Sequence, residues 1–165
     1  MKKLFYPDRW VKSAYDVDYS RLWEQGIRGI IFDIDNTLVN PNAPADARAK
    51  ELFSRLQKLG LKTVILSNNT GKRAGTFAKE VGSSVVTKAM KPLPHKYREA
   101  MRVMGTDENS TVFIGDQIYT DIWGANNAHV TSILTDPLTD REEFWIRWKR
   151  RLEKPVRAKL TKESG

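Results

Sequence analysis

Two aspartates lie two positions apart at the end of an apolar run, within residues 32–39 (FDIDNTLV). Aspartate is uncommon in strands, yet Asp33 and Asp35 directly follow the run 30–32, whose composition is typical of a buried strand. Two carboxylates this close repel each other unless positive charge lies between them. The segment therefore predicts a site for a cation, for a phosphate group, or for both.

Polar side chains follow the later apolar runs as well. In chain order they are Ser67 and Asn68 in TVILSNNT, Lys88 and Lys91 in KAMKPLP, and Asp116 and Asp121 in TVFIGDQIYTD. A carboxylate can attack phosphorus, and a second carboxylate can exchange a proton with the leaving group. Hydroxyl groups, such as that of Thr37, and ammonium groups can hold phosphoryl oxygens. Further carboxylates can hold magnesium.

These residues come together if the chain forms a parallel sheet. Short apolar runs alternate with segments of helical period, which is typical of repeated strand–helix units. The pattern predicts strands near residues 28–33, 62–67, 83–86, 111–115 and 130–134, and helices over residues 44–59, 71–81, 94–104 and 119–127. Gly60, Gly82 and Gly105 are the expected helix ends. Because ligands collect at the carboxyl ends of parallel strands, the polar groups are expected to line one pocket.

The ordered blocks DIDNT, SNN, KP and GDQIYTD resemble the four motifs of the haloacid dehalogenase (HAD) superfamily of phosphatases. Four blocks in the correct order, each after a predicted strand, are far more specific than a single DxDxT. The resemblance implies an α/β fold of three layers, a Rossmann-like parallel sheet with helices on both faces. Residues 4–135 also resemble the bacterial YqeG group of capless phosphatases in subfamily IIIA, which are related to mitochondrial phosphatidylglycerophosphate phosphatases.

The resemblance implies a two-step phosphoryl transfer. Asp33 would be the nucleophile that forms an aspartyl-phosphate, and Asp35 would be the general acid for the leaving alcohol and then the base for water. Thr37 and Ser67 would bind phosphoryl oxygens, with help from Asn68.

The resemblance also implies a lysine and a Mg²⁺ cofactor. Lys91 would neutralise charge on the nucleophile and on the transferring group; Lys88 is the competing choice, but Pro92 follows Lys91 as in the family's Lys-Pro block. Magnesium would be held by Asp33, the backbone carbonyl of Asp35, and Asp116, with Asp121 completing the acidic cluster.

Composition indicates one ordinary domain. The chain has 165 residues, 40% of them hydrophobic, which is enough for one core. It has no cysteine, so disulfides and thiolate metal sites are excluded. No apolar run approaches the length of a transmembrane helix, and a cytoplasmic protein is expected.

The net charge of +8 lies in the two ends, with +3 in residues 1–12 and +5 in residues 141–165. Thr139 and Glu142 have capping-box spacing, and Pro155 is the expected stop of a basic helix with four apolar residues on one face, namely Phe144, Trp145, Trp148 and Leu152. Such a helix could lie on an anionic membrane, or the same face could pack on the protein's own core. We expect a phosphatase domain over residues 1–138, the basic helix from residue 139, and a disordered tail over 156–165.

Motif spacing bears on the substrate. Only 32 residues separate Asp35 from Asn68, and 22 separate Asn68 from Lys91, so no cap domain fits between the motifs. The resemblance implies that capless members act on large or surface-bound phosphoesters. We therefore expect a Mg²⁺-dependent phosphomonoesterase for a phospholipid headgroup, phosphatidylglycerophosphate, at the inner face of the membrane. The alternatives are a phosphatase of a soluble metabolite or a phosphorylated macromolecule, and a ribosome- or RNA-associated binding factor that uses the basic ends.

Overall fold

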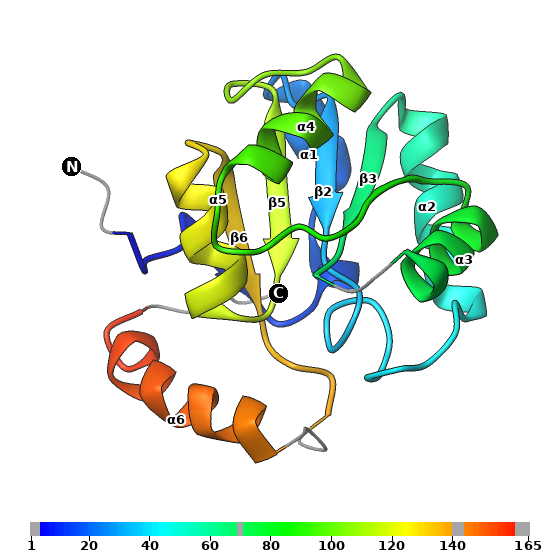
Figure 1. The fold of residues 1–165 in the computed structure, drawn as a ribbon. Coiled ribbons are helices and arrows are strands. Elements are labelled where there is room, and N and C mark those ends of the chain that lie inside the picture. The colour runs from blue at the N-terminus through cyan, green and yellow to red at the C-terminus, as the bar shows by residue number, and fades with distance from the viewer. Residues whose placement is uncertain (1–3, 69–70, 140–143, 161–165) are drawn as a thin grey trace.

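A parallel sheet of six strands forms the centre of the molecule (Figure 1). The computed structural model describes residues 4–68, 71–139 and 144–160, but not the side chains of 144–149. The strands are β1 (Arg9–Val11), β2 (Gly29–Phe32), β3 (Lys62–Leu66), β4 (Ser84–Val86), β5 (Thr111–Gly115) and β6 (Thr131–Thr135), in the order β1-β6-β5-β2-β3-β4. All five strands predicted from the sequence are present.

Helices cover both faces of this sheet (Figure 1). One face carries α1 (Tyr19–Glu24), α2 (Ala47–Leu59) and α3 (Lys72–Val81), and the other carries α4 (His95–Met104) and α5 (Trp123–Asn127). Side chains alternate along β2, so Ile30 and Phe32 join the core beneath α1–α3 while Ile31 joins the core beneath α4 and α5. The predicted three-layer α/β class is confirmed.

The helices α2, α3 and α4 end at the glycines predicted from the sequence. Gly60, Gly82 and Gly105 adopt left-handed backbone conformations, with φ of 87°, 75° and 68°, directly after α2, α3 and α4. Asp46 begins α2 by accepting a hydrogen bond of 2.8 Å from the backbone N–H of Ala49. These ends return the chain so that every strand runs the same way and the carboxyl ends of the strands share one edge.

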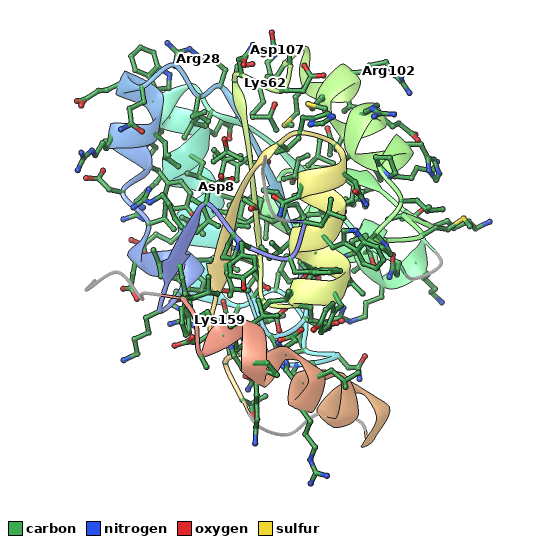
Figure 2. All side chains as sticks on the ribbon, turned by 90° about the vertical axis from the view of Figure 1, so that its left-hand side faces the viewer. Asp8, Arg28, Lys62, Arg102, Asp107 and Lys159 are labelled. Atoms are coloured by element: carbon green, nitrogen blue, oxygen red, sulfur yellow. The ribbon has the colours of Figure 1, made fainter. Side chains whose placement is uncertain are left out.

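The strand β1 was not predicted from the sequence. It pairs in parallel with β6, with Arg9 opposite Ile133. Asp8, labelled in Figure 2, anchors this edge because its carboxylate accepts a hydrogen bond of 2.8 Å from the N–H of Ser132. A short 3₁₀ turn, η1 (Ala14–Asp16), then leads to α1. A three-residue strand is too short for its periodicity to be read.

The segment predicted as one helix over 119–127 is divided in two. It begins with a π-helical turn, η2 (Ile118–Ile122), which is followed by α5. The wider turn brings the Asp121 carboxylate back to the N–H of Gln117 at 3.2 Å, beside the end of β5.

The helix α6 (Phe144–Arg157) lies beside the carboxyl ends of the strands (Figure 1). Figure 2 shows Lys159 far from Arg28 and Lys62, which lie at the opposite end of the sheet. The predicted stop at Pro155 is wrong, because the helix continues to Arg157. Residues 156–160 were expected to be disordered, but Val156 and Leu160 pack on a cluster formed by Ile118, Ile122 and Leu134.

The predicted apolar face of this helix is only partly described. Leu152 is 48% exposed, whereas Glu142 and the side chains of Phe144, Trp145 and Trp148 lie outside the described residues. No helix in the described part of the chain is long and apolar enough to cross a membrane.

No cap domain interrupts the sheet in the described residues. Between β2 and β3 the chain contains a loop and α2, and between β3 and β5 it contains α3, β4 and α4. The edge formed by the carboxyl ends of β2 and β5 is therefore not enclosed by an inserted domain.

Candidate active site

Three aspartates, two of them almost fully buried, meet at the carboxyl ends of β2 and β5. Asp33 follows β2, Asp116 follows β5, and Asp121 comes from η2. One carboxylate oxygen of each lies within 4.8 Å of the others. The side chain of Asp33 is 15% exposed, and those of Asp116 and Asp121 are almost fully buried. The structure thus brings together three of the acidic residues predicted from the sequence.

Lys91 joins this cluster. Its Nζ lies 3.0 Å from an Asp33 oxygen and 2.7 Å from an Asp121 oxygen, and its side chain is 5% exposed. The backbone N–H of Lys91 donates a hydrogen bond of 2.9 Å to the side-chain oxygen of Asn68, and the peptide bond to Pro92 is cis. Lys88, the competing choice, is exposed. The geometry favours Lys91 as the lysine of the site.

Burial shifts the ionisation of these groups. It raises the pKa of Asp33 to about 6; Lys91 opposes the shift, and the charge of Asp116 adds to it. The pKa values of Asp116 and Asp121 are raised for the same reason. Burial also disfavours the charge of Lys91, but Asp121 and Asp33 hold the pKa of its ammonium group well above the ordinary value.

Thr37 lies inside a tight turn after β2. Its side chain is buried, and its hydroxyl donates a hydrogen bond of 3.1 Å to a carboxylate oxygen of Asp116. The preceding Asn36 has a positive φ of 59°, a conformation that asparagine tolerates well, and its backbone carbonyl accepts a hydrogen bond from the N–H of Leu138. The turn therefore fixes Thr37 against the acidic cluster.

Ser67 and Asn68 end the neighbouring strand. The Ser67 side chain is buried, and its backbone pairs with Val86 and Ala89. Asn68 is exposed and contacts this region through its bond to the Lys91 backbone. Both residues lie at the same edge of the sheet as Asp33, because β3 pairs with β2.

Asp35 lies apart from the buried cluster. Its side chain is 35% exposed, and Arg73 from α3 holds it at 2.9 Å. The backbone N–H of Asn42 donates a second hydrogen bond of 2.9 Å to the carboxylate. The two aspartates of the DxD motif thus occupy different environments, one buried against Lys91 and one partly exposed against Arg73.

Tyr97, from α4, supports the backbone of Asp121. Its buried hydroxyl donates a hydrogen bond of 3.1 Å to the backbone carbonyl of Asp121. Gly115 provides the space that the Asp121 side chain needs, because a Cβ at Gly115 would lie 2.7 Å from an Asp121 carboxylate oxygen. The position of Asp121 is therefore set by Tyr97, which lies outside the motif, and by Gly115, the first residue of the motif.

Three charged residues of α6 also reach the cluster. Arg150 contacts the carboxylate of Asp116 and donates a hydrogen bond of 2.6 Å to its backbone carbonyl. Arg157 donates a hydrogen bond of 2.8 Å to the same carbonyl. Glu153, only 1% exposed, accepts a hydrogen bond of 2.8 Å from the N–H of Ile118 and lies 3.2 Å from Arg157.

Arg73, Arg150 and Glu153 were missed in the sequence-based prediction of the site. Positions 150, 153 and 157 fall on one helical face, so an acid flanked by two arginines was the available signal. Arg73 lies at the start of α3, five positions beyond the SNN motif's first asparagine, and nothing in its spacing identifies it.

The donor set suits a hard divalent cation. Asp33, Asp116 and Asp121 offer only oxygen atoms, they converge within 4.8 Å, and burial makes their mutual repulsion costly without positive charge. The residues therefore fit a magnesium ion.

Comparisons with known proteins show the family of this chain. Residues 42–129 match the family described as haloacid dehalogenase-like hydrolase. The chain is 34% identical, over 99% of its length and 95% of the relative's, to a Bacillus subtilis protein named probable phosphatase YqeG.

More distant likenesses were found among plant proteins and solved structures. An Arabidopsis thaliana protein named phosphatidylglycerophosphate phosphatase 1 is 28% identical over 92% of this chain, which spans only 47% of that protein's length. The cobalt-bound deoxy-D-mannose-octulosonate 8-phosphate phosphatase of Haemophilus influenzae superposes with a TM-score of 0.52 at 13% identity, over 79% of this chain and 89% of the other. At that identity the superposition shows a shared fold alone.

Proposed function

Because the chain belongs to the haloacid dehalogenase-like hydrolase family, we propose that it is a Mg²⁺-dependent phosphomonoesterase whose substrate is phosphatidylglycerophosphate. The observation that carries this proposal is the placement of two aspartates in two environments. Asp33 is buried beside Lys91, whereas Asp35 lies apart and partly exposed. A nucleophile and a proton donor require this difference.

Asp33 is the nucleophile in this proposal. Its carboxylate attacks phosphorus, the bond between phosphorus and the leaving oxygen breaks, and an aspartyl-phosphate forms. Lys91, 3.0 Å away, keeps the carboxylate ionised despite burial and neutralises charge on the transferring group. Water then attacks the same phosphorus, which releases phosphate and restores Asp33.

Asp35 moves the protons. Its carboxyl group donates a proton to the leaving alcohol in the first step and accepts one from water in the second. Arg73 and the N–H of Asn42 orient the carboxylate without burying it, so it remains open to solvent and substrate.

The phosphoryl oxygens are held by Thr37, Ser67, Asn68 and Lys91 in this proposal. These residues supply hydroxyl, amide and ammonium donors from the ends of two neighbouring strands and the loop before α4. Thr37 would exchange its present bond to Asp116 for one to the substrate.

Magnesium would be held by Asp33, the backbone carbonyl of Asp35, and Asp116, with Asp121 completing the cluster. The ion would supply positive charge that draws the phosphoryl group and the nucleophile together. The Asp116 carboxylate forms an ion pair with Arg150 in this structure, so Asp116 has to give up this ion pair to bind the metal ion.

The lipid substrate is supported by the names of the relatives and by the open edge. The plant protein that is 28% identical, and an algal protein that is 29% identical, are both named phosphatidylglycerophosphate phosphatase 1. No cap domain covers the site in the described residues. A lipid substrate would place the enzyme at the surface of an anionic membrane, in a peripheral contact at its inner face.

The test is phosphate release from phosphatidylglycerophosphate in mixed micelles, with and without Mg²⁺, by the wild type and by Asp33→Asn. Release that requires both the metal ion and Asp33 supports the proposal. Metal-dependent turnover of a water-soluble phosphoester, with the lipid left intact, would retain the phosphatase and exclude this substrate.

A further inference from the structure

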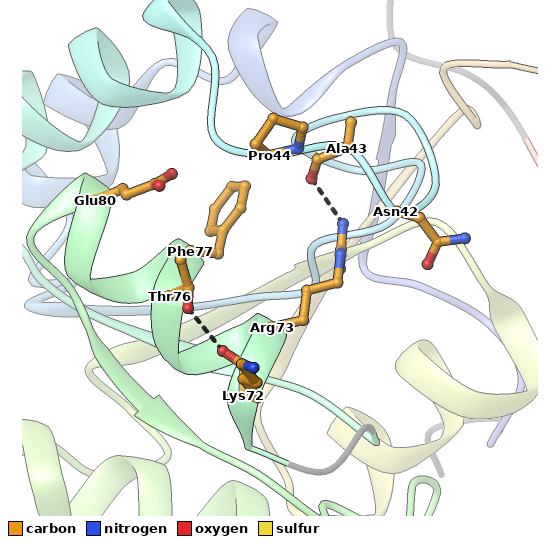
Figure 3. A pocket seen from close by; sticks show the side chains of 8 residues that line it. All are labelled: Asn42, Ala43, Pro44, Lys72, Arg73, Thr76, Phe77 and Glu80. Atoms are coloured by element: carbon orange, nitrogen blue, oxygen red, sulfur yellow. Dashed lines mark hydrogen bonds between the residues drawn. The ribbon is translucent and has the colours of Figure 1, made fainter.

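A cavity of about 570 Å³ lies between α3 and the loop 42–44. Its walls include Pro44 from the loop and Lys72, Arg73, Phe77 and Glu80 from α3. Figure 3 shows Arg73 and Phe77 pointing from the helix toward this loop. The volume falls within the range of small-molecule sites in proteins.

This cavity adjoins Asp35. Arg73 lines it, contacts the Asp35 carboxylate at 2.9 Å, and donates a hydrogen bond of 2.8 Å to the carbonyl of Ala43 (Figure 3). Asn42, another lining residue, donates its backbone N–H to the same carboxylate. Two lining residues therefore connect the cavity directly to the proposed general acid.

The proposed reaction requires part of the substrate to lie near Asp35, which this cavity adjoins. A general acid has to lie within hydrogen-bond reach of the oxygen that it protonates, and that oxygen belongs to the leaving alcohol. The alcohol half of the substrate must therefore pass Asp35, whereas the phosphoryl half faces Asp33. The cavity is the space available beyond Asp35, and this step rests on the proposed function.

The cavity has positively charged residues at one end and a negatively charged residue at the other. Lys72 and Arg73 lie at the start of α3, and Glu80 lies two turns further along the same helix. Arg73 forms an ion pair with Asp35, but no ion pair of Lys72 is found among the described residues. The end nearest Asp35 therefore has a cation available for a ligand.

We propose that this cavity binds the alcohol half of the substrate, and that Lys72 binds a second phosphate group carried by that alcohol. Phe77 and Pro44 provide apolar walls for the carbon atoms that join the two phosphates. Glu80 repels an anion, so it keeps the second phosphate at the Lys72 end. In phosphatidylglycerophosphate that second phosphate is a phosphodiester, whereas in a soluble bisphosphate it is a second monoester; both present anionic phosphoryl oxygens to Lys72.

Two substrate pairs test this proposal, and in each pair one member carries a second phosphate and the other lacks it. The soluble pair is glycerol 1,3-bisphosphate and glycerol 3-phosphate. The lipid pair, in the same mixed micelles, is phosphatidylglycerophosphate and phosphatidic acid. The measured quantity is the ratio of initial kcat/KM values within each pair. A preference in the lipid pair alone identifies a headgroup site, and a preference in both pairs identifies a site for any bisphosphate of this alcohol.

Lys72→Met should lower the ratio about tenfold, because a charge-assisted contact to the second phosphate is lost. Glu80→Gln should raise it, because a repelling charge is removed. Lys79→Met is the matched control: Lys79 is an exposed lysine of the same helix that does not line the cavity, and its loss should leave the ratio unchanged.

The possible failures are distinguishable. If no phosphomonoester is hydrolysed in an Asp33-dependent manner, the proposed function fails. If hydrolysis is intact but Lys72→Met and Lys79→Met give the same ratio in both pairs, the site proposal fails alone. Calorimetric titration of Asp33→Asn with the two soluble compounds gives a binding readout independent of turnover. Equal affinity for both compounds, or equal affinity with and without Lys72, would also overturn the site proposal.

Discussion

The guanidinium of Arg150 contacts both the carboxylate and the backbone carbonyl of Asp116. A side chain of α6 therefore binds one of the three aspartates of the acidic cluster. The Arg150 side chain is 15% exposed, and Glu153 lies 3.6 Å from it in the same helix. A guanidinium and a divalent cation compete for one carboxylate, because each neutralises the same charge.

Replacing Arg150 should therefore tighten magnesium binding. For Arg150→Met we expect about a tenfold lower dissociation constant for Mg²⁺, because Asp116 no longer has to give up a charge-assisted hydrogen bond. Isothermal titration calorimetry of the purified protein measures this change. Arg151→Met is the matched control, since Arg151 is the exposed neighbour. Weaker binding by Arg150→Met would show instead that Arg150 positions Asp116 for the ion.

The loss of the charge of Lys91 should have a large effect, and the loss of the charge of Lys88 should have almost none. Lys91→Met leaves Asp33 and Asp121 buried without their shared cation, so we expect a loss of about 3 kcal/mol in the free energy of unfolding. Phosphate release should fall by about a hundredfold or more. Lys88→Met, at an exposed position, should change the free energy of unfolding by less than about 0.5 kcal/mol.

Urea unfolding and phosphate release, measured on the same preparations, separate the two effects. Circular dichroism establishes that the variants are folded under the assay conditions. An active Lys91→Met protein alongside an inactive Lys88→Met protein would reverse the assignment of the lysine.

The sequence predicts those site residues that directly follow a strand, because the ends of the strands fix their positions. Asp33 and Asp116 follow two strands that pair with each other, and the parallel sheet brings their ends together whatever covers its faces. Lys91 was preferred over Lys88 because Pro92 follows it, as in the family's Lys-Pro block, and its Nζ lies in the cluster.

The contacts of α6 were not predictable in the same way. Arg150 lies 34 positions from Asp116, and its neighbours are mostly basic, a pattern that suits a membrane surface as well as an internal packing face. In the described part of the helix, Arg150, Glu153 and Arg157 make contacts within the protein, and Leu152 of the apolar face is 48% exposed. The strand β1 was not predicted for a related reason: only its pairing with β6, a tertiary contact, defines it as a strand.

The raised pKa of Asp33 predicts a pH dependence of stability in the metal-free protein. Its value is about 6 in the folded state and 3.8 in the unfolded chain, so between these values the folded state holds a proton that the unfolded chain has released. The free energy of unfolding of the wild type, relative to Asp33→Asn, should rise by about 1.4 kcal/mol per unit as the pH falls from about 6 toward 4.

Chemical denaturation in the presence of EDTA, at several pH values, measures this difference. The comparison with Asp33→Asn removes the contribution of carboxylates that do not interact with Asp33, because both proteins share them, whereas Asp116 and Asp121, which interact with Asp33, are part of the measured difference. A difference that is constant over this range would mean that burial does not raise the pKa of Asp33.

Two glycine-to-alanine substitutions should have opposite effects on stability. A Cβ at Gly115 would lie 2.7 Å from both the Asp121 carboxylate and the Phe113 ring, so Gly115→Ala has to displace Asp121 from Lys91. We expect a loss of about 1–3 kcal/mol and weaker phosphate release. A Cβ at Gly75, inside α3, would meet no neighbouring group within 4 Å, and Gly75→Ala should stabilise the protein by about 0.5–1 kcal/mol. Thermal unfolding compares the two variants, and equal stability would contradict the crowding at Gly115.

The proton-donating role of Asp35 predicts a dependence on the leaving group. Asp35→Asn should lower kcat/KM for glycerol 3-phosphate by about 10²–10⁴-fold, because an alkoxide leaves poorly without a proton. The loss should be much smaller for 4-nitrophenyl phosphate, whose leaving group is stable as an anion. Because kcat/KM reports the steps up to the first phosphoryl transfer, the later role of Asp35 as a base does not obscure the comparison.

Glu108→Gln is the control for the removal of a carboxylate. Glu108 is exposed and adjoins Asp107, which Figure 2 places at the end of the sheet opposite α6. This variant should leave both kcat/KM values unchanged. If Asp35→Asn lowers kcat/KM equally for the alkyl and the aryl phosphate, Asp35 does not protonate the leaving group. Its partly exposed position between Arg73 and Asn42 would then serve substrate binding, because an interaction that is insensitive to the leaving oxygen acts on a part of the substrate that both compounds share.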